Sequence, residues 1–161
     1  MKKETIYCID MDGVAARWNV HGDPHKEGYF LTPEAEEVVL EAAKILKCAG
    51  IDVVFLTKCY DRNAERDKRE WLDHHGMEDF HMIGLPYEEE KSAYAPEGRH
   101  CVLLDDNTDN LFEWTDSGRT GVKFYNGING TRHRWTGPSV RQDQRAEEIA
   151  DLLLRYGYRT Y

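Results

Sequence analysis

Short apolar runs and longer segments with helical periodicity alternate along the chain. The runs, such as IDVVFLT and CVLLDD, are almost continuously apolar and do not alternate apolar with polar positions. This pattern is typical of strands in a parallel sheet, which are buried on both faces. We therefore predict five strands, at residues 5–11, 51–57, 80–85, 101–106 and 122–126.

Between these strands, apolar residues recur every three or four positions, which predicts helices. The clearest helix covers residues 33–49. Thr32 is expected to cap it, Pro33 to lie in its first turn and Gly50 to end it. The other helices are expected at 62–75, which is very polar, at 109–116, and from about residue 139 onward.

Strands that alternate with helices predict one α/β domain over residues 1–161. The expected architecture is a doubly wound, Rossmann-like parallel five-stranded sheet with helices on both faces. Only residues 13–31 separate the first strand from the first long helix, which leaves room for a flap and not for a large cap domain. In such folds, ligands bind at the carboxyl ends of the strands, near the point where the strand order reverses. Residues that follow the strands directly are therefore the candidates for a functional site.

The composition limits what this site can bind. The 161 residues carry a net charge of −9, from 30 acidic and 21 basic residues, which argues against general nucleic-acid binding. No apolar stretch reaches the ~20 residues of a membrane span, and the four scattered cysteines are typical of reduced thiols, so we expect a cytoplasmic protein. To bind a phosphorylated substrate, a protein of this charge needs a metal ion or a few well-placed cations.

Carboxylates gather at the predicted strand ends. Asp10 and Asp12 end the first strand, and Asp105 and Asp106 end the fourth. In an extended chain, residues i and i+2 point to the same side, so the first pair should face one small volume if the chain bends at Gly13. One carboxylate of that pair can attack while the other moves a proton. Four carboxylates at one edge would repel each other without a cation, and hard oxygen ligands at this density suit Mg²⁺.

Four motifs, in this order, resemble those of the haloacid-dehalogenase-like (HAD) phosphohydrolase superfamily. They are DMDGV at 10–14, the strand-end threonine of VVFLT at 53–57, Lys91 in EEEKSAY, and LLDD at 103–106. The resemblance covers about residues 5–110. The combination of DMDGV, LLDDNTDN and KFYNGINGT is further similar to the 5′(3′)-deoxyribonucleotidase-like branch, although the chain lacks the larger helical cap of those enzymes.

The resemblance implies a role for each matching carboxylate. Asp10 would be the nucleophile, which forms an aspartyl-phosphate. Asp12 would protonate the leaving oxygen and then deprotonate the water that hydrolyses this intermediate. Mg²⁺ would be held by Asp10, by the backbone carbonyl of Asp12 and by the pair Asp105 and Asp106, with Asp106 as the expected direct ligand.

The resemblance also implies that Thr57 and Lys91 hold the phosphoryl oxygens. Lys58, next to Thr57, is an alternative to Lys91 in this role, and Lys91 could instead be an exposed lysine in a charged stretch. Phosphoryl transfer needs mainly positioning and charge neutralisation, so one metal ion and one lysine supply what is required.

The loop at residues 126–138 follows the fifth strand and so leaves from the same edge of the sheet. Arg132, Arg134 and Trp135 combine phosphate-binding and base-stacking groups, which makes this segment a candidate substrate loop. The alternative is an ordinary surface loop with Trp135 packed on the core.

Together, these patterns predict a Mg²⁺-dependent phosphomonoester hydrolase that acts on a (deoxy)nucleoside monophosphate or a similar small phosphate ester. One alternative is a phosphatase for a macromolecular phosphate, such as a nucleic-acid 3′ end. Another is a non-catalytic phosphoryl-binding regulatory protein, against which the retention of both Asp10 and Asp12 argues. An open site suits a bulkier ester or closure by a second subunit, so a homo-oligomer stays an alternative.

Overall fold

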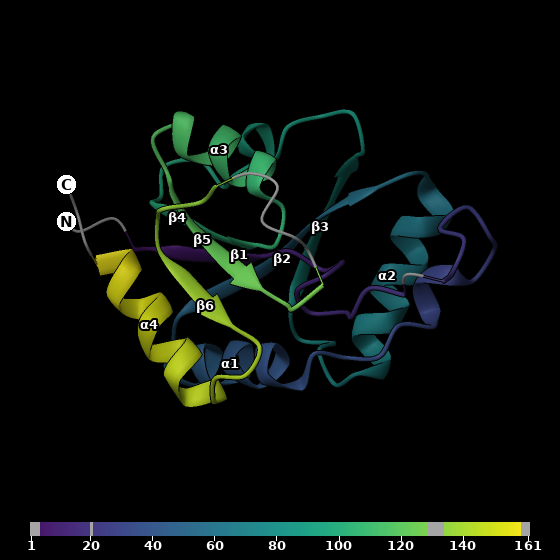
Figure 1. Cartoon of the computed structure of the whole chain (residues 1–161), viewed down its shortest axis with the longest axis horizontal. Coiled ribbons are helices and arrows are strands. Elements are labelled where there is room, and N and C mark those ends of the chain that lie inside the picture. The colour runs from purple at the N-terminus through teal and green to yellow at the C-terminus, as the bar shows by residue number, and fades with distance from the viewer. Residues whose placement is uncertain (1–3, 20, 129–133, 159–161) are drawn as a thin grey trace.

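The computed structural model describes residues 4–19, 21–128 and 134–158, and it contains one parallel sheet (Figure 1). The sheet has six strands in the order β3-β2-β1-β4-β5-β6, and every neighbouring pair is parallel. This is the strand order of a doubly wound fold. The strands are β1 (Ile6–Ile9), β2 (Asp52–Cys59), β3 (His81–Pro86), β4 (Cys101–Asp105), β5 (Thr120–Tyr125) and β6 (Ser139–Arg141).

Helices cover both faces of this sheet (Figure 1). Side chains alternate between the faces along each strand, so Tyr7 and Ile9 of β1 pack into one apolar cluster and Ile6 and Cys8 into the other. The first cluster lies under α1 (Glu37–Cys48), α2 (Arg62–His74) and α4 (Ala146–Tyr158), and the second under α3 (Thr108–Asp116) and the 3-10 helix η2 (Lys91–Tyr94). Among the described residues, no helix combines the length and apolar character that a membrane crossing requires.

The prediction of five strands was wrong by one, because residues 139–141 form the edge strand β6 and do not begin a helix. Ser139–Arg141 pairs with Lys123–Tyr125, and Val140 is buried against the same core as α4. A three-residue strand with one buried side chain leaves no periodic signal in the sequence. A turn then follows, in which the Gln144 amide donates to the Arg141 carbonyl, and α4 begins at Ala146.

The first long helix begins later than predicted, at Glu37. The three residues before it run beside the turn that follows β1: the Arg17 amide donates to the Glu34 carbonyl, and the Glu36 amide donates to the Ala15 carbonyl. These bonds hold residues 34–36 out of the helix. Thr32 instead closes the 3-10 helix η1 (Tyr29–Leu31), where its hydroxyl donates to the Tyr29 carbonyl.

The strand order reverses between β1 and β4, and this positions the candidate site. The register pairs Ile9 with Leu104, so the next residues, Asp10 and Asp105, leave the carboxyl edge side by side. Ligands in open parallel sheets bind at such a switch point, because the loops on its two sides diverge there.

Candidate active site

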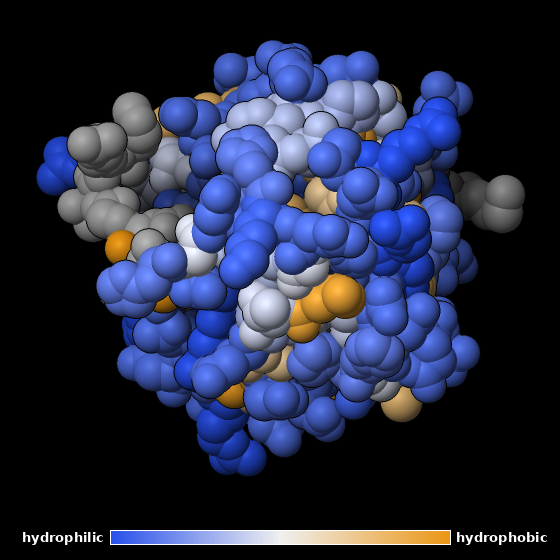
Figure 2. Space-filling view, turned by 90° about the vertical axis from the view of Figure 1, so that its right-hand side faces the viewer, coloured by the Kyte–Doolittle hydropathy of each residue, from blue (hydrophilic) through white to orange (hydrophobic). Residues whose placement is uncertain are grey.

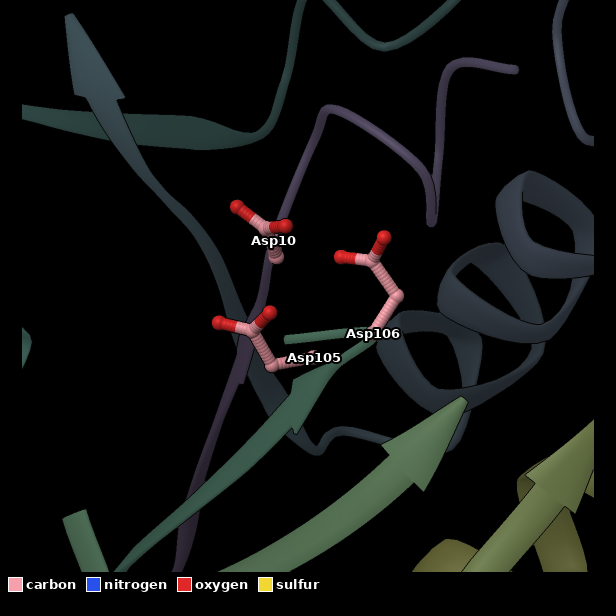
Figure 3. A group of neighbouring side chains, drawn as sticks. All are labelled: Asp10, Asp105 and Asp106. Carbon is pink, nitrogen blue, oxygen red and sulfur yellow. The ribbon is translucent and has the colours of Figure 1, made fainter. Parts of the chain in front are cut away.

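Three buried carboxylates converge at the carboxyl ends of β1 and β4 (Figure 3). Asp10 follows β1, Asp105 ends β4 and Asp106 comes next. One oxygen from each lies within 4.8 Å of the others. The two strand ends thus bring residues almost a hundred positions apart into one acidic cluster.

Lys91 at the start of η2 joins two of these carboxylates. Its ammonium nitrogen lies 2.8 Å from Asp10 Oδ1 and 2.9 Å from Asp105 Oδ2, and only 1% of the residue is exposed. Burial alone would lower the pKa of Lys91, but the two carboxylates raise it above its usual value. Lys91 is therefore a buried cation inside the cluster and not an exposed lysine of the charged stretch before it.

The cluster keeps an excess of negative charge. Burial, and then the nearby Asp105 carboxylate, raise the pKa of Asp10 well above its ordinary value and raise the pKa of Asp106 to about 7. When all three carboxyl groups are ionised, the single lysine leaves two negative charges, which a divalent cation would neutralise. Closely spaced carboxylate oxygens are ligands that suit Mg²⁺, so the donor set fits this ion.

A tight turn after β1 orients Asp12, and Gly13 makes it possible. The strand ends at Ile9, earlier than predicted, and the Val14 and Ala16 amides both donate to the Met11 carbonyl. Gly13 has φ +85°, and a Cβ there would lie 2.1 Å from Asp106 Oδ2. Asp10 and Asp12 line the same cleft, and the chain turns between Met11 and Ala16. Glycine is required both for the backbone angle and for the space.

Asp12 stands apart from the acidic cluster and pairs with Lys68 of α2. The Lys68 ammonium lies 2.7 Å from Asp12 Oδ2 and also donates to Thr57 Oγ1 at 3.0 Å and to the Lys58 carbonyl at 2.7 Å. Lys68 is almost fully buried, whereas 23% of the Asp12 side chain is exposed. The two residues predicted as proton carrier and phosphate ligand, Asp12 and Thr57, are thus held by one cation.

The sequence interpretation missed Lys68, although a signal was present. Residues 62–75 were expected to be a polar helix, and lysine in such a helix is normally solvated. Ala64, Trp71 and Leu72, however, lie three or four positions from Lys68, so all four share the buried face of α2. The periodicity of the apolar residues therefore pointed Lys68 inward.

Three further residues that the sequence interpretation missed surround Asp106. The indole nitrogen of Trp18 donates to Asp106 Oδ2 at 3.1 Å, and the Asn126 amide nitrogen lies 3.3 Å from the same oxygen and 2.8 Å from the Gly13 carbonyl oxygen. The Lys123 ammonium donates to the Asp106 backbone carbonyl. Lys123 interrupts the apolar run of β5, which is the one sequence sign of its role.

A cleft of about 390 Å³ opens above this arrangement. Its charged part is formed by Asp10, Asp12, Asp106, Lys58 and Lys91, so five of the predicted residues share one cavity. Thr57 is fully buried beneath it, behind Lys68. The remaining lining is mostly aromatic or amide: Trp18, Pro24, Phe30, Tyr60, Tyr87, Asn107 and Asn110.

Trp135 of the predicted substrate loop packs against the apolar cluster that lies under α3. Its ring lies 5.6 Å from that of Phe112, it contacts the apolar cluster that contains Leu111, and its indole donates to the Pro138 carbonyl at 2.8 Å. This placement favours the packing alternative over base stacking. Arg134 is exposed, and Arg132 lies outside the described residues.

No protein-family model and no curated protein matches the sequence, but solved structures do share its fold. A D,D-heptose 1,7-bisphosphate phosphatase from B. bronchiseptica, complexed with magnesium and phosphate, aligns with a TM-score of 0.64 at 13% identity over 96% of this chain and 99% of its own. The same enzyme from Burkholderia thailandensis gives 0.65 at 14% identity, over 94% and 99%. A HAD-superfamily hydrolase from Ehrlichia chaffeensis gives 0.63 at 10% identity, over 97% and 98%.

At these identities, the comparisons establish the fold. The chain has the α/β fold of HAD-superfamily hydrolases, over almost the whole length of each neighbour. The narrower likeness to the 5′(3′)-deoxyribonucleotidase-like branch stays a prediction.

Proposed function

We propose that this protein is a Mg²⁺-dependent phosphomonoester hydrolase of the HAD superfamily that works through an aspartyl-phosphate. The observation that carries the proposal is the buried group of Asp10, Asp105, Asp106 and Lys91 beneath an open cleft at the switch point of the sheet. The fold supports the proposal, because it is shared with phosphatases, one of which was solved in complex with magnesium and phosphate.

In the first step, an oxygen of Asp10 attacks phosphorus, and the bond from phosphorus to the ester oxygen breaks. About 11% of the Asp10 side chain is exposed, which lets the substrate reach it from the cleft. Asp12 supplies the proton that the departing alkoxide needs, because its carboxyl group faces the same cleft. Lys68 donates to Oδ2 of this group and fixes its position, so Asp12 would carry the proton for the leaving oxygen on Oδ1 when the substrate enters.

In the second step, water attacks the phosphorus of the aspartyl-phosphate and releases inorganic phosphate. Asp12, which lost its proton in the first step, accepts one from this water. Asp10 is regenerated as a carboxylate, and Lys91 stabilises it again through the 2.8 Å contact. Protons and charges balance over the two steps, so the cycle needs no further reactant.

Charge neutralisation comes from Lys91 and the metal ion. Lys91 has three donors and spends two of them on Asp10 and Asp105, which leaves one for a phosphoryl oxygen. Asp10, Asp106 and the backbone carbonyl of Asp12 would hold Mg²⁺, which would offset the charge of the phosphoryl group. Lys58, which lines the cleft at the end of β2, would add a contact to the phosphoryl oxygens, whereas Thr57 is fully buried behind Lys68 and would act through that residue.

The substrate that we propose is a (deoxy)nucleoside monophosphate or a similar small phosphate ester. A cleft of about 390 Å³ accommodates a group of that size. The heptose bisphosphate phosphatases that share the fold act on phosphorylated sugars, so sugar phosphates belong in the same test.

The test is phosphate release from a panel of nucleoside 5′- and 3′-monophosphates, sugar phosphates and a generic aryl phosphate. Each ester is assayed with Mg²⁺ and with a chelator, for the wild type and for Asp10→Asn as the matched inactive control. We expect release that needs both Mg²⁺ and Asp10. Inorganic phosphate binding without turnover of any ester would support a phosphoryl-binding regulatory protein instead.

A further inference from the structure

Two tyrosines stack at the rim of the cleft because two strands run in register. The pairing of β2 with β3 places Cys59 opposite Pro86, so the next residues, Tyr60 and Tyr87, leave the carboxyl edge side by side. Their ring centroids lie 4.7 Å apart, with 21° between the ring planes. Both line the same cleft as Asp10 and Lys91.

The flap extends this pair into a row of rings. Phe30 lies 6.3 Å from Tyr60 and His25 lies 4.9 Å from it, both measured between ring centroids. Tyr87 stands at the other end of the row and is 51% exposed. Three rings of this row, those of Phe30, Tyr60 and Tyr87, line the cleft together with its charged residues.

The side of the molecule seen in Figure 2 is hydrophilic over most of its area, with apolar residues in small separate patches. A broad protein-docking surface would show a larger continuous apolar area. Exposed rings at the mouth of a small cavity instead suit a small flat ligand, which gains stacking contacts there.

We infer that Tyr87, whose ring stacks on that of Tyr60, is the surface on which a planar ring of the substrate stacks. The inference rests on the proposed function and makes its substrate class narrower: phosphate esters whose alcohol carries an aromatic or heteroaromatic ring, as nucleoside monophosphates do. The phosphoryl group lies over Asp10 and Lys91 while the ring lies at the rim. Asn107 and Asn110, which also line the cleft, offer amide groups to the polar edge of such a ring.

The test compares two probes that share a ribose 5-phosphate group and differ at C1, where adenosine 5′-monophosphate carries adenine and ribose 5-phosphate carries a hydroxyl. The quantity measured is the ratio of their kcat/KM values. Base stacking on an aromatic side chain contributes enough to change affinity by about tenfold or more. We expect Tyr87→Ala to lower this ratio about tenfold and Tyr87→Phe, which keeps the ring, to leave it within about twofold.

Tyr60→Ala should lower the ratio as well, because it removes the ring on which Tyr87 stacks. Tyr158→Ala is the matched control, since Tyr158 is an exposed tyrosine on α4, outside this cleft. An unchanged ratio in Tyr87→Ala, with a melting temperature equal to that of the wild type, would overturn the inference.

A binding measurement separates this inference from the proposed function. In the Asp10→Asn background, calorimetry gives the Kd of both probes without turnover. Tighter binding of adenosine 5′-monophosphate that Tyr87→Ala abolishes supports the stacking surface even if the wild type releases no phosphate from any ester. Equal affinity for the two probes contradicts it even if the wild type is an active phosphatase.

Discussion

The floor and the rim of this cleft are both positioned by the register of neighbouring parallel strands, but they differ in their chemistry. At the floor, the register of β1 with β4 sets Asp10 beside Asp105; at the rim, the register of β2 with β3 sets Tyr60 beside Tyr87. The floor is buried and charged, whereas the rim is neutral and half-exposed. Charges in a buried site depend strongly on each other, while exposed ring contacts are weaker and nearly independent. Substitutions at the floor should therefore abolish turnover, whereas substitutions at the rim should change only the selectivity between substrates.

The largest expected effect is at the nucleophile. Asp10→Asn should leave less than ~1% of wild-type turnover, because an amide cannot attack phosphorus. The fold should survive, since asparagine has the same shape and removes one charge from a crowded cluster. Initial rates of phosphate release and a melting curve check both statements. Turnover above a few percent of the wild-type rate would show that Asp10 is not the nucleophile.

Asp12→Asn should have the next largest effect. General acid and base catalysis contributes about 10²–10⁴-fold, and the amide supplies neither function. The Lys68 ammonium can still donate to the amide oxygen, so the surrounding contacts change little. The loss should be largest for esters with a poorly stabilised leaving group, which a comparison of aryl and alkyl phosphates measures. Equal rates for variant and wild type across the pH range would remove Asp12 from the mechanism.

The two neighbouring carboxylates of β4 should differ in their effect on the metal. Asp105 is fully used by the protein: its Oδ1 accepts from the Asn107 amide at 2.8 Å, and its Oδ2 from Lys91 at 2.9 Å and from Asn110 at 3.2 Å. Asp106 Oδ2 also accepts from Trp18 at 3.1 Å and from Asn126 at 3.3 Å, but Asp106 lines the cleft and Asp105 does not.

Removal of Asp106 should therefore weaken magnesium binding more than removal of Asp105. Loss of a supporting residue beside a metal ligand typically costs 10–100-fold in affinity, and loss of the ligand itself should cost at least that. Magnesium titrations of Asp106→Ala and Asp105→Ala decide the order, and a chelator should abolish activity in the wild type. A greater loss of affinity in Asp105→Ala would reverse the assignment.

Much of the floor was predictable from the sequence, and the rim was not. A carboxylate that interrupts an apolar strand is visible locally, so Asp10 and Asp105 stood out, and the resemblance to a known family added Lys91. Tyr60 and Tyr87 are 27 positions apart by their numbering, and only the register of two strands joins them. Local sequence carries no sign of that register.

Prediction of the fold shows the same limit. The five longer strands had clear apolar runs, while β6 contributes one buried side chain, Val140, and gave no sign of itself. Lys68 was missed for another reason: its residue type outweighed its position on the buried face of α2. The position on the helix is the stronger indicator of burial, because helical spacing is a geometric fact and solvation of lysine is only a tendency.

The effect of pH on the melting temperature can test the charge at the floor of the cleft without an assay of activity. The pKa of Asp106 is raised from 3.8 to about 7, first by burial and then by Asp105. A carboxyl group with a raised pKa costs stability when it ionises, so this penalty grows as the pH rises from about 4 and is complete above about 7. Asp106→Asn removes the ionisation.

Without metal at pH 8, Asp106→Asn should therefore melt higher than the wild type, by at least roughly 2–4 °C, which corresponds to ~1 kcal/mol in a domain of this size. At pH 5 the difference should shrink. Mg²⁺ should raise the melting temperature of the wild type and not that of the variant. A variant that melts lower than the wild type at both pH values would show that Asp106 is a structural residue.

The smallest expected effect on selectivity lies outside both regions, at Trp135. Its ring packs on Phe112 and on the cluster under α3, and its indole bonds the Pro138 carbonyl. Trp135→Ala should therefore lower the melting temperature and leave the ratio of kcat/KM for adenosine 5′-monophosphate over ribose 5-phosphate within about twofold of the wild type. Tyr87→Ala should do the reverse, with a lower ratio and a nearly unchanged melting temperature, because its ring is half-exposed. The two variants thus form a crossed pair, measured with the same two substrates and one melting curve each. A fall in the ratio for Trp135→Ala at constant melting temperature would move the ring-binding surface from the rim to the loop at 126–138.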